Sequence, residues 1–294
     1  MVNFLKAVGA IEGEDTKTAL AKRYAQTIYP DLADQPLTPA KQGNEYFTFL
    51  ANDEVIRIAR NQGVADNMGR EAALQELFTG QFSEARTADI TDFQPDNFCM
   101  RMRKLEGEPL TASLIETLPL HEQAAVALKL GTFIKELHGI TPSDTSHLPP
   151  SDEMKTRLLG KIDGLEQRGD SQLDPQRLKQ ARSYVENQDQ LPDTKAMIHG
   201  DLAPDNILYD PKTGSLGIID FNNTKTAYRH QEFAVMAHFY PEKFVHSVID
   251  SYQKDRPSPD LKGLVRTGMD VMSITHNNTA QDSYKLPTPG QLKR

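Results

Sequence analysis

The sequence predicts an α+β fold with two lobes: a strand-rich N-terminal lobe over residues 1–104 and a mainly helical C-terminal lobe over residues 105–294. Aromatic and β-branched residues, interrupted by turn residues, concentrate in the first lobe and are typical of strands. Apolar residues at helical spacing dominate the second lobe. The length of 294 residues provides ample core for both. A cleft between lobes is a common place for a ligand.

The N-terminal lobe is expected to begin with a helix over residues 15–28, which Asp15 or Thr16 can cap. A hairpin is expected over residues 45–58, because EYFTF and VIRI flank an Asn-Asp turn. A second helix is expected over residues 68–79, and further strand-like residues follow it to the end of the lobe.

In the C-terminal lobe the clearest helix covers residues 120–138, where apolar side chains fall on one face. Helices also fit residues 151–168 and 174–188, and two short strands, AMIHG and GIIDF, bracket the turn YDPKTGS. Residues 228–272 are mostly helical in pattern. The polar residues 275–294 contain two prolines and predict either a flexible tail or a lid over a pocket.

Composition excludes several classes of protein. The net charge is −8 and the sequence has no Lys/Arg run, which argues against a nucleic-acid partner. No window approaches the 18 or so apolar residues of a membrane span, so no membrane association is expected. The single cysteine, Cys99, lies in an apolar run and is expected to be a buried small side chain. Together with the lack of a signal-peptide pattern, this predicts a cytoplasmic protein.

The stretch IHGDLAPDN holds the first group of residues that indicate chemistry. Gly200 and Pro204 are incompatible with a regular helix, so Asp201 is expected on a bent loop. Asp201 and Asn206 can then point into one space. An Asp carboxylate can accept a proton or orient a hydroxyl, and an Asn oxygen can bind a hard cation such as magnesium.

The stretch IIDFNN places Asp220 after an apolar strand, 19 residues beyond Asp201. Each motif alone is as consistent with a turn or a cap as with a site. Together, in this order, they indicate phosphoryl transfer, which needs one group for the attacking oxygen and metal ligands near the phosphates. His199 is expected to pack and hydrogen-bond near Phe221 rather than to act in catalysis.

These motifs resemble the catalytic loop and metal-binding strand of the aminoglycoside phosphotransferase and choline kinase superfamily, the small-molecule branch of the protein-kinase-like fold. The resemblance covers roughly residues 40–235. It implies a bilobal protein-kinase-like fold and transfer of the γ-phosphate of ATP, with Mg²⁺, to a hydroxyl of a small molecule. By the same resemblance Asp201 is the catalytic base, and Asn206 and Asp220 are the magnesium ligands.

The N-terminal lobe contains matching segments. VIRIAR resembles the strand that usually carries a Lys on the α- and β-phosphates, and here the residue is Arg57. REAALQELF resembles the helix whose Glu pairs with that cation, which implies Glu71, with Glu76 as the competing choice. An exposed salt bridge of little energetic value is the alternative interpretation of this pair.

Two further segments resemble the nucleotide-binding elements of the family. QGNEYF resembles the loop over the phosphates, with Gly43 and Asn44 at its turn, although it has one glycine instead of a glycine-rich repeat. CMRMRKLEGEPL resembles the hinge between the lobes. The resemblance implies that backbone groups near Met102 and Arg103 hold the adenine.

Two features argue against a protein substrate. Ala203 stands where Ser/Thr protein kinases place a Lys, and only nine residues separate Asn222 from Glu232, with no Ala-Pro-Glu after them. Glu232-Phe233-Ala234 occupies the position of the family's Asp-Leu-Ala, and the longer Glu side chain can still anchor the loop.

The acceptor is expected to be a hydroxylated metabolite or an aminoglycoside-like molecule. The absence of Trp counts against choline, which an aromatic cage would bind. Carboxylates for an aminoglycoside, or simply a solvated acidic surface, are available at Glu232, Asp250, Asp255, Asp270 and Asp282. The alternatives are a nucleotide-binding pseudokinase, favoured by Arg57 and Asn222, and a kinase or nucleotidyl transferase acting on protein. ATP versus GTP and the oligomeric state stay open at this point.

Overall fold

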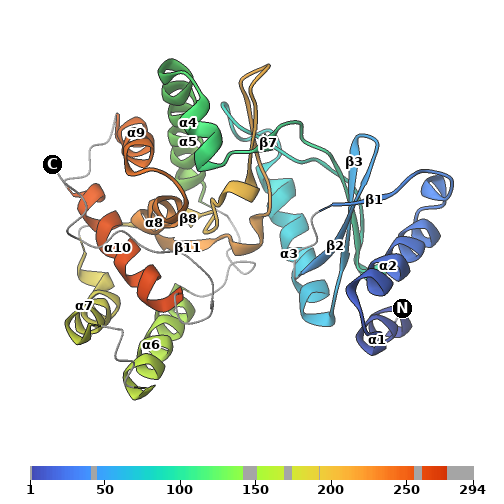
Figure 1. The fold of residues 1–294 in the computed structure, drawn as a ribbon, viewed down its shortest axis with the longest axis horizontal. Helices are drawn as coiled ribbons and strands as arrows, with labels where there is room; N and C mark the ends of the chain where they lie inside the picture. Colours follow the sequence, from blue (N-terminus) through green and yellow to red (C-terminus); the bar gives the residue numbers. More distant parts are fainter. Residues whose placement is uncertain are drawn as a thin grey trace.

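The computed structural model describes residues 2–40, 45–141, 151–168, 174–191, 193–254 and 260–276. A strand-rich part and a mainly helical part lie side by side (Figure 1), which confirms the predicted α+β, two-lobed fold. The tail expected over residues 275–294 falls, from residue 277 onward, outside the described residues.

The N-terminal part is built on an antiparallel sheet in the order β1-β2-β3-β6-β5. Its strands are β1 (Thr38–Pro39), β2 (Tyr46–Ala51), β3 (Glu54–Ala59), β5 (Ile90–Gln94) and β6 (Cys99–Arg103). β2 and β3 form the predicted hairpin, and Asn52 takes the left-handed conformation in its turn at φ 53°. Asn tolerates this conformation better than most residues, so the Asn-Asp turn fixes the register of the hairpin.

Helices cover both faces of this sheet (Figure 1). α1 (Val2–Ala10) and α2 (Glu14–Ile28) pack on one face, and α3 (Gln62–Phe78) packs on the other. The sequence analysis did not predict α1. α2 begins after Gly13, so Asp15 lies in the first turn and is not the cap. α3 starts six residues earlier than predicted because the Asn61 side chain accepts a hydrogen bond from the Val64 N–H.

The C-terminal part contains seven described helices. They are α4 (Ala112–Thr117), α5 (Leu120–Gly139), α6 (Ser151–Arg168), α7 (Pro175–Glu186), α8 (Arg229–Phe239), α9 (Glu242–Gln253) and α10 (Leu261–His276). α5 and α9 form the most extensive helix pair and enclose the main apolar core together with α8 and α10. The helices predicted over residues 120–138, 151–168 and 174–188 are confirmed to within two residues.

Short strands form two small sheets in the C-terminal part. They are β4 (Arg86–Thr87), β7 (Glu108–Pro109), β8 (Lys195–Ile198), β9 (Ile207–Asp210), β10 (Ser215–Ile218) and β11 (Lys225–Tyr228). β8 pairs with β11, whereas β10 pairs with β9 and β4. The two predicted strands therefore do not pair with each other. β11, the partner of β8, and β9, a partner of β10, were not predicted as strands.

Gly131 permits the close approach of α5 to α9. A Cβ at this position would lie 2.7 Å from the Ser251 Cβ and 2.8 Å from the Val248 carbonyl oxygen. We expect Gly131→Ala to lower the free energy of unfolding by about 1–3 kcal/mol, because backbone atoms of α9 cannot move aside cheaply. The measurement is urea unfolding followed by circular dichroism.

Gly139→Ala is the matched control for this prediction. It lies in the same helix, and a Cβ there would meet nothing within 4 Å. We expect a change smaller than about 1 kcal/mol, toward greater stability, because Ala favours the helix over Gly. Equal destabilisation by both substitutions would show that the α5–α9 contact is not the cause.

Candidate active site

The loop after β8 carries Asp201 and is held in a bent path by Gly200. Gly200 has φ +77°, and a Cβ on it would lie 2.7 Å from the Asn223 carbonyl oxygen. Both observations require glycine at this position. A short 3₁₀ turn, Pro204–Asn206, follows and leads into β9. The loop therefore turns back on itself between Asp201 and Asn206, as the sequence predicts.

Asp201 and Asn206 are joined directly. The Asn206 side-chain N–H₂ donates to the Asp201 carbonyl oxygen at 2.9 Å and to Asp201 Oδ2 at 3.1 Å. Asn223 donates to the same carboxylate oxygen at 3.4 Å. Burial raises the pKa of Asp201, and the negative charge of Asp220 raises it further. A carboxylate with a raised pKa is a better proton acceptor than an exposed one.

Asp220 follows β10 and is held close to the catalytic loop. Its backbone is left-handed, at φ 67°, which redirects the chain into the 3₁₀ turn Phe221–Asn223. The neighbouring residue, Ile219, bonds to the loop twice: its N–H donates to the Asn206 carbonyl at 3.1 Å, and its carbonyl accepts from His199 Nε2 at 3.1 Å. These bonds bring the two predicted motifs together.

Arg57 from β3 reaches the same place from the N-terminal part. Its guanidinium pairs with Glu71 of α3 and lies 3.4 Å from Asp220 Oδ2. Tyr46 donates to the second oxygen of Glu71 at 2.9 Å and stacks under Arg57. Glu71 is buried, whereas the competing candidate Glu76 is exposed. The structure thus forms the predicted Arg57–Glu71 pair as a buried bridge between sheet, helix and Asp220.

The other predicted nucleotide-binding residues are placed as follows. Met102 and Arg103 end β6, beside the segment that connects the two parts. The Arg103 N–H donates to the Asp89 carbonyl at 2.8 Å, so this N–H already has a hydrogen-bond acceptor within the protein. Gly43 and Asn44 lie outside the described residues, in the connection between β1 and β2.

The donor set of Asp220 and Asn206 fits a divalent cation such as Mg²⁺. Asp220 Oδ1 is buried and has no hydrogen-bond partner in the structure. The amide nitrogen of Asn206 is used by Asp201, so its oxygen is the atom that can act as a ligand. Within the described residues no cluster of three or more His, Cys, Asp or Glu could hold a metal. Two protein ligands suit Mg²⁺, which keeps several waters and binds substrate phosphates.

His199 is a buried structural residue, as predicted. Its ring lies 4.8 Å from the Phe221 ring, and burial lowers the pKa of His199 to about 4, so the ring is neutral at pH 7. Its Nδ1 accepts from the Asp201 N–H at 3.3 Å, which places the ring proton on Nε2. His199 therefore joins the loop that carries Asp201 to Ile219, the residue before Asp220.

Glu232 anchors the loop that carries Asp201 through hydrogen bonds to its backbone. It is fully buried in α8 and accepts hydrogen bonds from the N–H groups of His199 at 2.6 Å and Gly200 at 3.1 Å. The sequence analysis considered Glu232 both as a loop anchor and as a carboxylate for the acceptor. The first interpretation is confirmed and the second is wrong, because the side chain bonds to backbone groups and has no exposed surface.

We expect Glu232 to make stability depend on pH. Burial raises the pKa of Glu232 from 4.5 to about 7, so the unfolded chain releases this proton at lower pH than the folded chain. The free energy of unfolding therefore falls as pH rises, and Glu232→Gln removes this contribution. Between about pH 4 and about pH 8 the stability of the wild type relative to the variant should fall by about 3 kcal/mol.

The wild type and the variant contain the same buried histidines. The contribution of these histidines to the pH dependence of stability therefore cancels in the difference between the two proteins. Urea unfolding across the pH range measures the difference at each pH. Parallel curves for wild type and variant would contradict the raised pKa of Glu232. A retained catalytic-loop conformation in Glu232→Gln, checked by amide hydrogen exchange of Gly200, is the control for local collapse.

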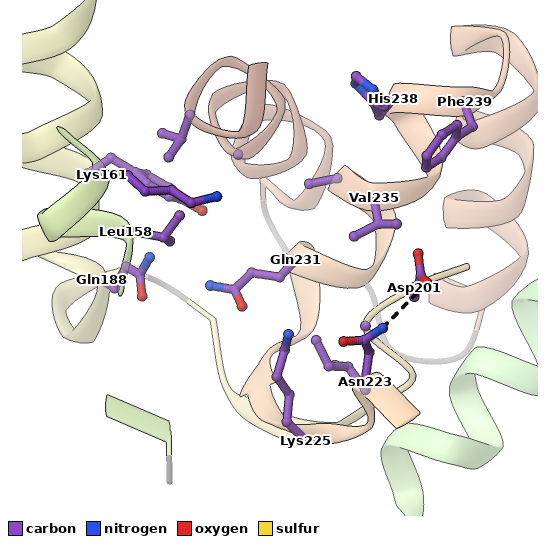
Figure 2. A pocket seen from close by; sticks show the side chains of 16 residues that line it. Leu158, Lys161, Gln188, Asp201, Asn223, Lys225, Gln231, Val235, His238 and Phe239 are labelled. Atoms are coloured by element: carbon purple, nitrogen blue, oxygen red, sulfur yellow. Dashed lines mark hydrogen bonds between the residues drawn. The ribbon is translucent and has the colours of Figure 1, made fainter. Parts of the chain in front are cut away.

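A pocket of about 400 Å³ opens beside Asp201 (Figure 2). Its described lining comes from α6, α7, β8, β11, α8 and α10 of the C-terminal part and from the loops at Asp201 and Asn223. Apolar side chains such as Leu158, Val235 and Phe239 form much of the wall. The volume is in the range of small-molecule sites. The sequence analysis missed these lining residues because they are scattered over 114 positions of the chain, from Leu158 to Val271.

The sequence profile described as "Phosphotransferase enzyme family" matches residues 37–261, which is most of the chain. The chain belongs to this phosphotransferase family. Solved structures similar to this chain are aminoglycoside and macrolide phosphotransferases, and the resemblance to the aminoglycoside phosphotransferase and choline kinase superfamily is confirmed. A search of curated protein sequences finds no match.

Solved structures confirm the fold of this phosphotransferase. A GDP and kanamycin complex of APH(2")-IIia is 23% identical and has a TM-score of 0.71, with 86% of this chain and 88% of that chain covered. A streptomycin-ATP-APH(2")-IIa ternary complex is 19% identical, with a TM-score of 0.65 and coverage of 82% and 85%. Macrolide 2'-phosphotransferase type I is 16% identical, with a TM-score of 0.66 and coverage of 86% and 90%.

None of the helices that the structure describes is long and apolar enough to cross a bilayer.

Proposed function

We propose that this phosphotransferase moves the γ-phosphate of MgATP to a hydroxyl group of a small molecule, with Asp201 as the catalytic base. The observation that carries the proposal is the meeting of Asp201, Asn206 and Asp220 beside an open pocket. The family match supports the reaction class. The small-molecule complexes of the solved relatives support a hydroxylated acceptor.

In the proposed reaction the acceptor hydroxyl lies against Asp201, which lines the pocket. The hydroxyl oxygen forms a bond to the γ-phosphorus, and Asp201 accepts the hydroxyl proton. The bond from the γ-phosphorus to its bridging oxygen breaks, and ADP leaves with that electron pair. Asn206 and Asn223 hold the Asp201 carboxylate in place by donating to it. Positioning and electrostatic stabilisation provide most of the catalysis in such transfers.

The N-terminal part is proposed to hold the nucleotide. Arg57, kept in place by Glu71 and Tyr46, contacts the phosphates. Gly43 and Asn44, between β1 and β2, cover the phosphates. The backbone at Met102 and Arg103 meets the adenine. Because the Arg103 N–H is used by Asp89, the carbonyl is the group of Arg103 that is proposed to bind the base.

Asp220 and Asn206 would hold Mg²⁺ through Asp220 Oδ1 and the Asn206 amide oxygen. The cation would offset the negative charge that Asp201, Glu71 and Asp220 place around the phosphates. In the structure, Arg57 offsets part of this charge through its ion pairs with Glu71 and Asp220. When bound, it would stabilise the charge that develops on the transferred group.

The proposal is tested by measuring the transfer of label from two nucleotides to several classes of acceptor. The full chain is incubated with Mg²⁺ and ATP labelled at the γ-position or, in a parallel reaction, at the α-position. The same reactions are run with labelled GTP, and each contains a panel of small alcohols, amino sugars and sugar acids. Label on a small molecule is the expected result. Label on protein, label transferred only from the α-position, or nucleotide binding without any transfer to any acceptor would overturn the proposal.

A further inference from the structure

The amide of Gln188 is a buried polar group on the wall of the acceptor pocket. Gln188 begins the 3₁₀ turn after α7, and only 5% of the residue is exposed. Its Nε2 has no hydrogen-bond partner in the part of the chain that the structure describes. Gln188 and Leu158 line one side of the cavity, and Asp201 and Val235 line the other (Figure 2). Because buried amides nearly always have a partner, a molecule bound in the cavity is the candidate partner of Gln188.

Tyr184, one helical turn before Gln188, also lines the cavity. Its hydroxyl is hydrogen-bonded to Nε2 of His230, which is fully buried in α8. The other ring nitrogen, Nδ1, lies 2.7 Å from Asp193 Oδ2. Asp193 Oδ1 accepts in turn from Arg229 Nε at 2.8 Å. A chain of buried hydrogen bonds therefore fixes the Tyr184 hydroxyl at the cavity wall.

The direction of these hydrogen bonds follows from the charge of Asp193. Burial acts to raise the pKa of Asp193, but hydrogen bonds from His230 and Arg229 outweigh burial and lower this pKa to about 2. The ionised carboxylate only accepts, so His230 Nδ1 carries a proton and, in the neutral ring, Nε2 carries none. Nε2 then accepts the Tyr184 proton. The lone pairs of the Tyr184 oxygen remain for a donor in the cavity.

Small residues keep space open beside the Tyr184 hydroxyl. Ala234 of α8 and Gly268 of α10 line the same cavity. A Cβ on Gly268 would lie 3.5 Å from the Tyr184 hydroxyl oxygen and 3.1 Å from the Ala234 Cβ. Any side chain at position 268 would occupy the space next to the hydroxyl, and glycine leaves this space to the cavity.

Resting on the proposed transfer reaction, we infer that Gln188 and Tyr184 bind a second hydroxyl group of the acceptor, on the side away from the reacting hydroxyl at Asp201. A rotation of the Gln188 side chain presents its amide, which donates to the oxygen of this group, and the Tyr184 oxygen accepts its proton. A hydroxyl group satisfies both residues because it donates and accepts at once. An ether oxygen would satisfy only Gln188, and an ammonium group only Tyr184. The acceptor class is therefore a diol or polyol.

The first test measures whether the fold itself needs the Gln188 amide. Gln188→Met keeps the length of the side chain and removes the amide. If the amide serves a ligand, the urea midpoint of the ligand-free protein should stay unchanged or rise by up to about 0.3 M. The matched control is Gln75→Met, because Gln75 is buried likewise and its Nε2 donates to the Ala88 carbonyl. This control should lower the midpoint. A lower midpoint in Gln188→Met would show that the fold uses the amide and would overturn the inference.

The second test measures the binding of probes that differ in one group. Cyclohexane-1,4-diol offers a second hydroxyl, 4-methoxycyclohexanol an ether oxygen, 4-aminocyclohexanol an ammonium group, and cyclohexanol none of these. We expect the full chain to bind the diol about tenfold more tightly than cyclohexanol, with Kd measured by ligand-observed NMR. Equal Kd values for the diol and cyclohexanol would overturn the inference.

Two variants assign the preference to the two residues. Gln188→Met should remove the preference for the diol and for the ether over cyclohexanol. Tyr184→Phe should remove only the preference for the diol over the ether, since the ether has no proton to donate. The control Tyr209→Phe, a buried tyrosine of β9 outside the described pocket lining, should change neither ratio. A diol-to-ether ratio that survives Tyr184→Phe would contradict the role of Tyr184.

Transfer of label from γ-labelled ATP to the same probes separates this inference from the proposed reaction. If the diol preference appears in binding, and neither a probe nor any member of the acceptor panel receives phosphate, the failure falls on the proposed reaction. If cyclohexanol and the diol receive phosphate with equal kcat/KM, the second-hydroxyl site falls and the phosphotransferase reaction stands.

Discussion

Asp201→Asn is expected to lower kcat for phosphoryl transfer by about 1,000-fold while the Kd for the nucleotide changes less than about threefold. The substitution keeps the size of the side chain and its contact with Asn206, and it removes the proton acceptor. The burial that raises the pKa of Asp201 makes this carboxylate a stronger base than an exposed Asp, which increases the loss. Single-turnover transfer and calorimetric titration with the nucleotide measure the two quantities.

Asp205→Asn is the matched control, because Asp205 lies in the same loop, is exposed and does not line the pocket. Its kcat should stay within about twofold of the wild type. Wild-type turnover in Asp201→Asn would show that the hydroxyl proton leaves by another route, and the assignment of the base would fall.

The second large effect is expected at Asp220. Asp220→Asn should lower kcat/KM for the nucleotide at least about 100-fold and raise the Mg²⁺ concentration that gives half-maximal rate. Asn removes the charge that would hold the cation but tolerates the left-handed backbone that Asp220 adopts. Ala would also add backbone strain, so the effect of the lost charge could not be separated from the effect of the strain. Initial rates over a range of Mg²⁺ concentrations measure the shift.

Asp210→Asn provides the comparison for Asp220, since Asp210 ends β9 of the hairpin that precedes Asp220 and accepts hydrogen bonds from Lys212 and Thr213 in its turn. It should leave the Mg²⁺ dependence unchanged. If Asp220→Asn and Asp210→Asn behave alike, the effect comes from the hairpin and not from a metal ligand. If Asp220→Asn retains the Mg²⁺ dependence of the wild type, Asp220 does not hold the cation.

Much of the site could be predicted from the sequence because its residues lie in short, constrained segments. Gly200 and Pro204 allow few backbone paths, so the approach of Asn206 to Asp201 followed from five residues of sequence. The Arg57–Glu71 pair was predicted from the resemblance of VIRIAR and REAALQELF to a strand and a helix of the family, and the structure forms it. Helical spacing alone could not choose between Glu71 and Glu76. The burial of Glu71 against Tyr46 makes that choice.

Other features depended on contacts that no local pattern encodes. Glu232 lies 32 residues after Gly200, yet its carboxylate accepts a hydrogen bond from the Gly200 N–H. Arg70 of α3 bonds to the Asn222 carbonyl across 152 residues and so fastens the N-terminal helix to the Asp220 turn. The strand pairings of β8 and β10 were also missed, because their partners are four residues long and have little periodicity of their own.

The sequence by itself determined the two-lobed fold class and the phosphoryl-transfer motifs, since periodicity and short motifs are local properties of the chain. Only the tertiary structure decided the character of the acceptor pocket. Lys161 and Lys225 come from a helix and a strand that are 64 residues apart, and each alone is indistinguishable from a solvated surface lysine. Both line the pocket beside Asp201 because folding brings the two walls together.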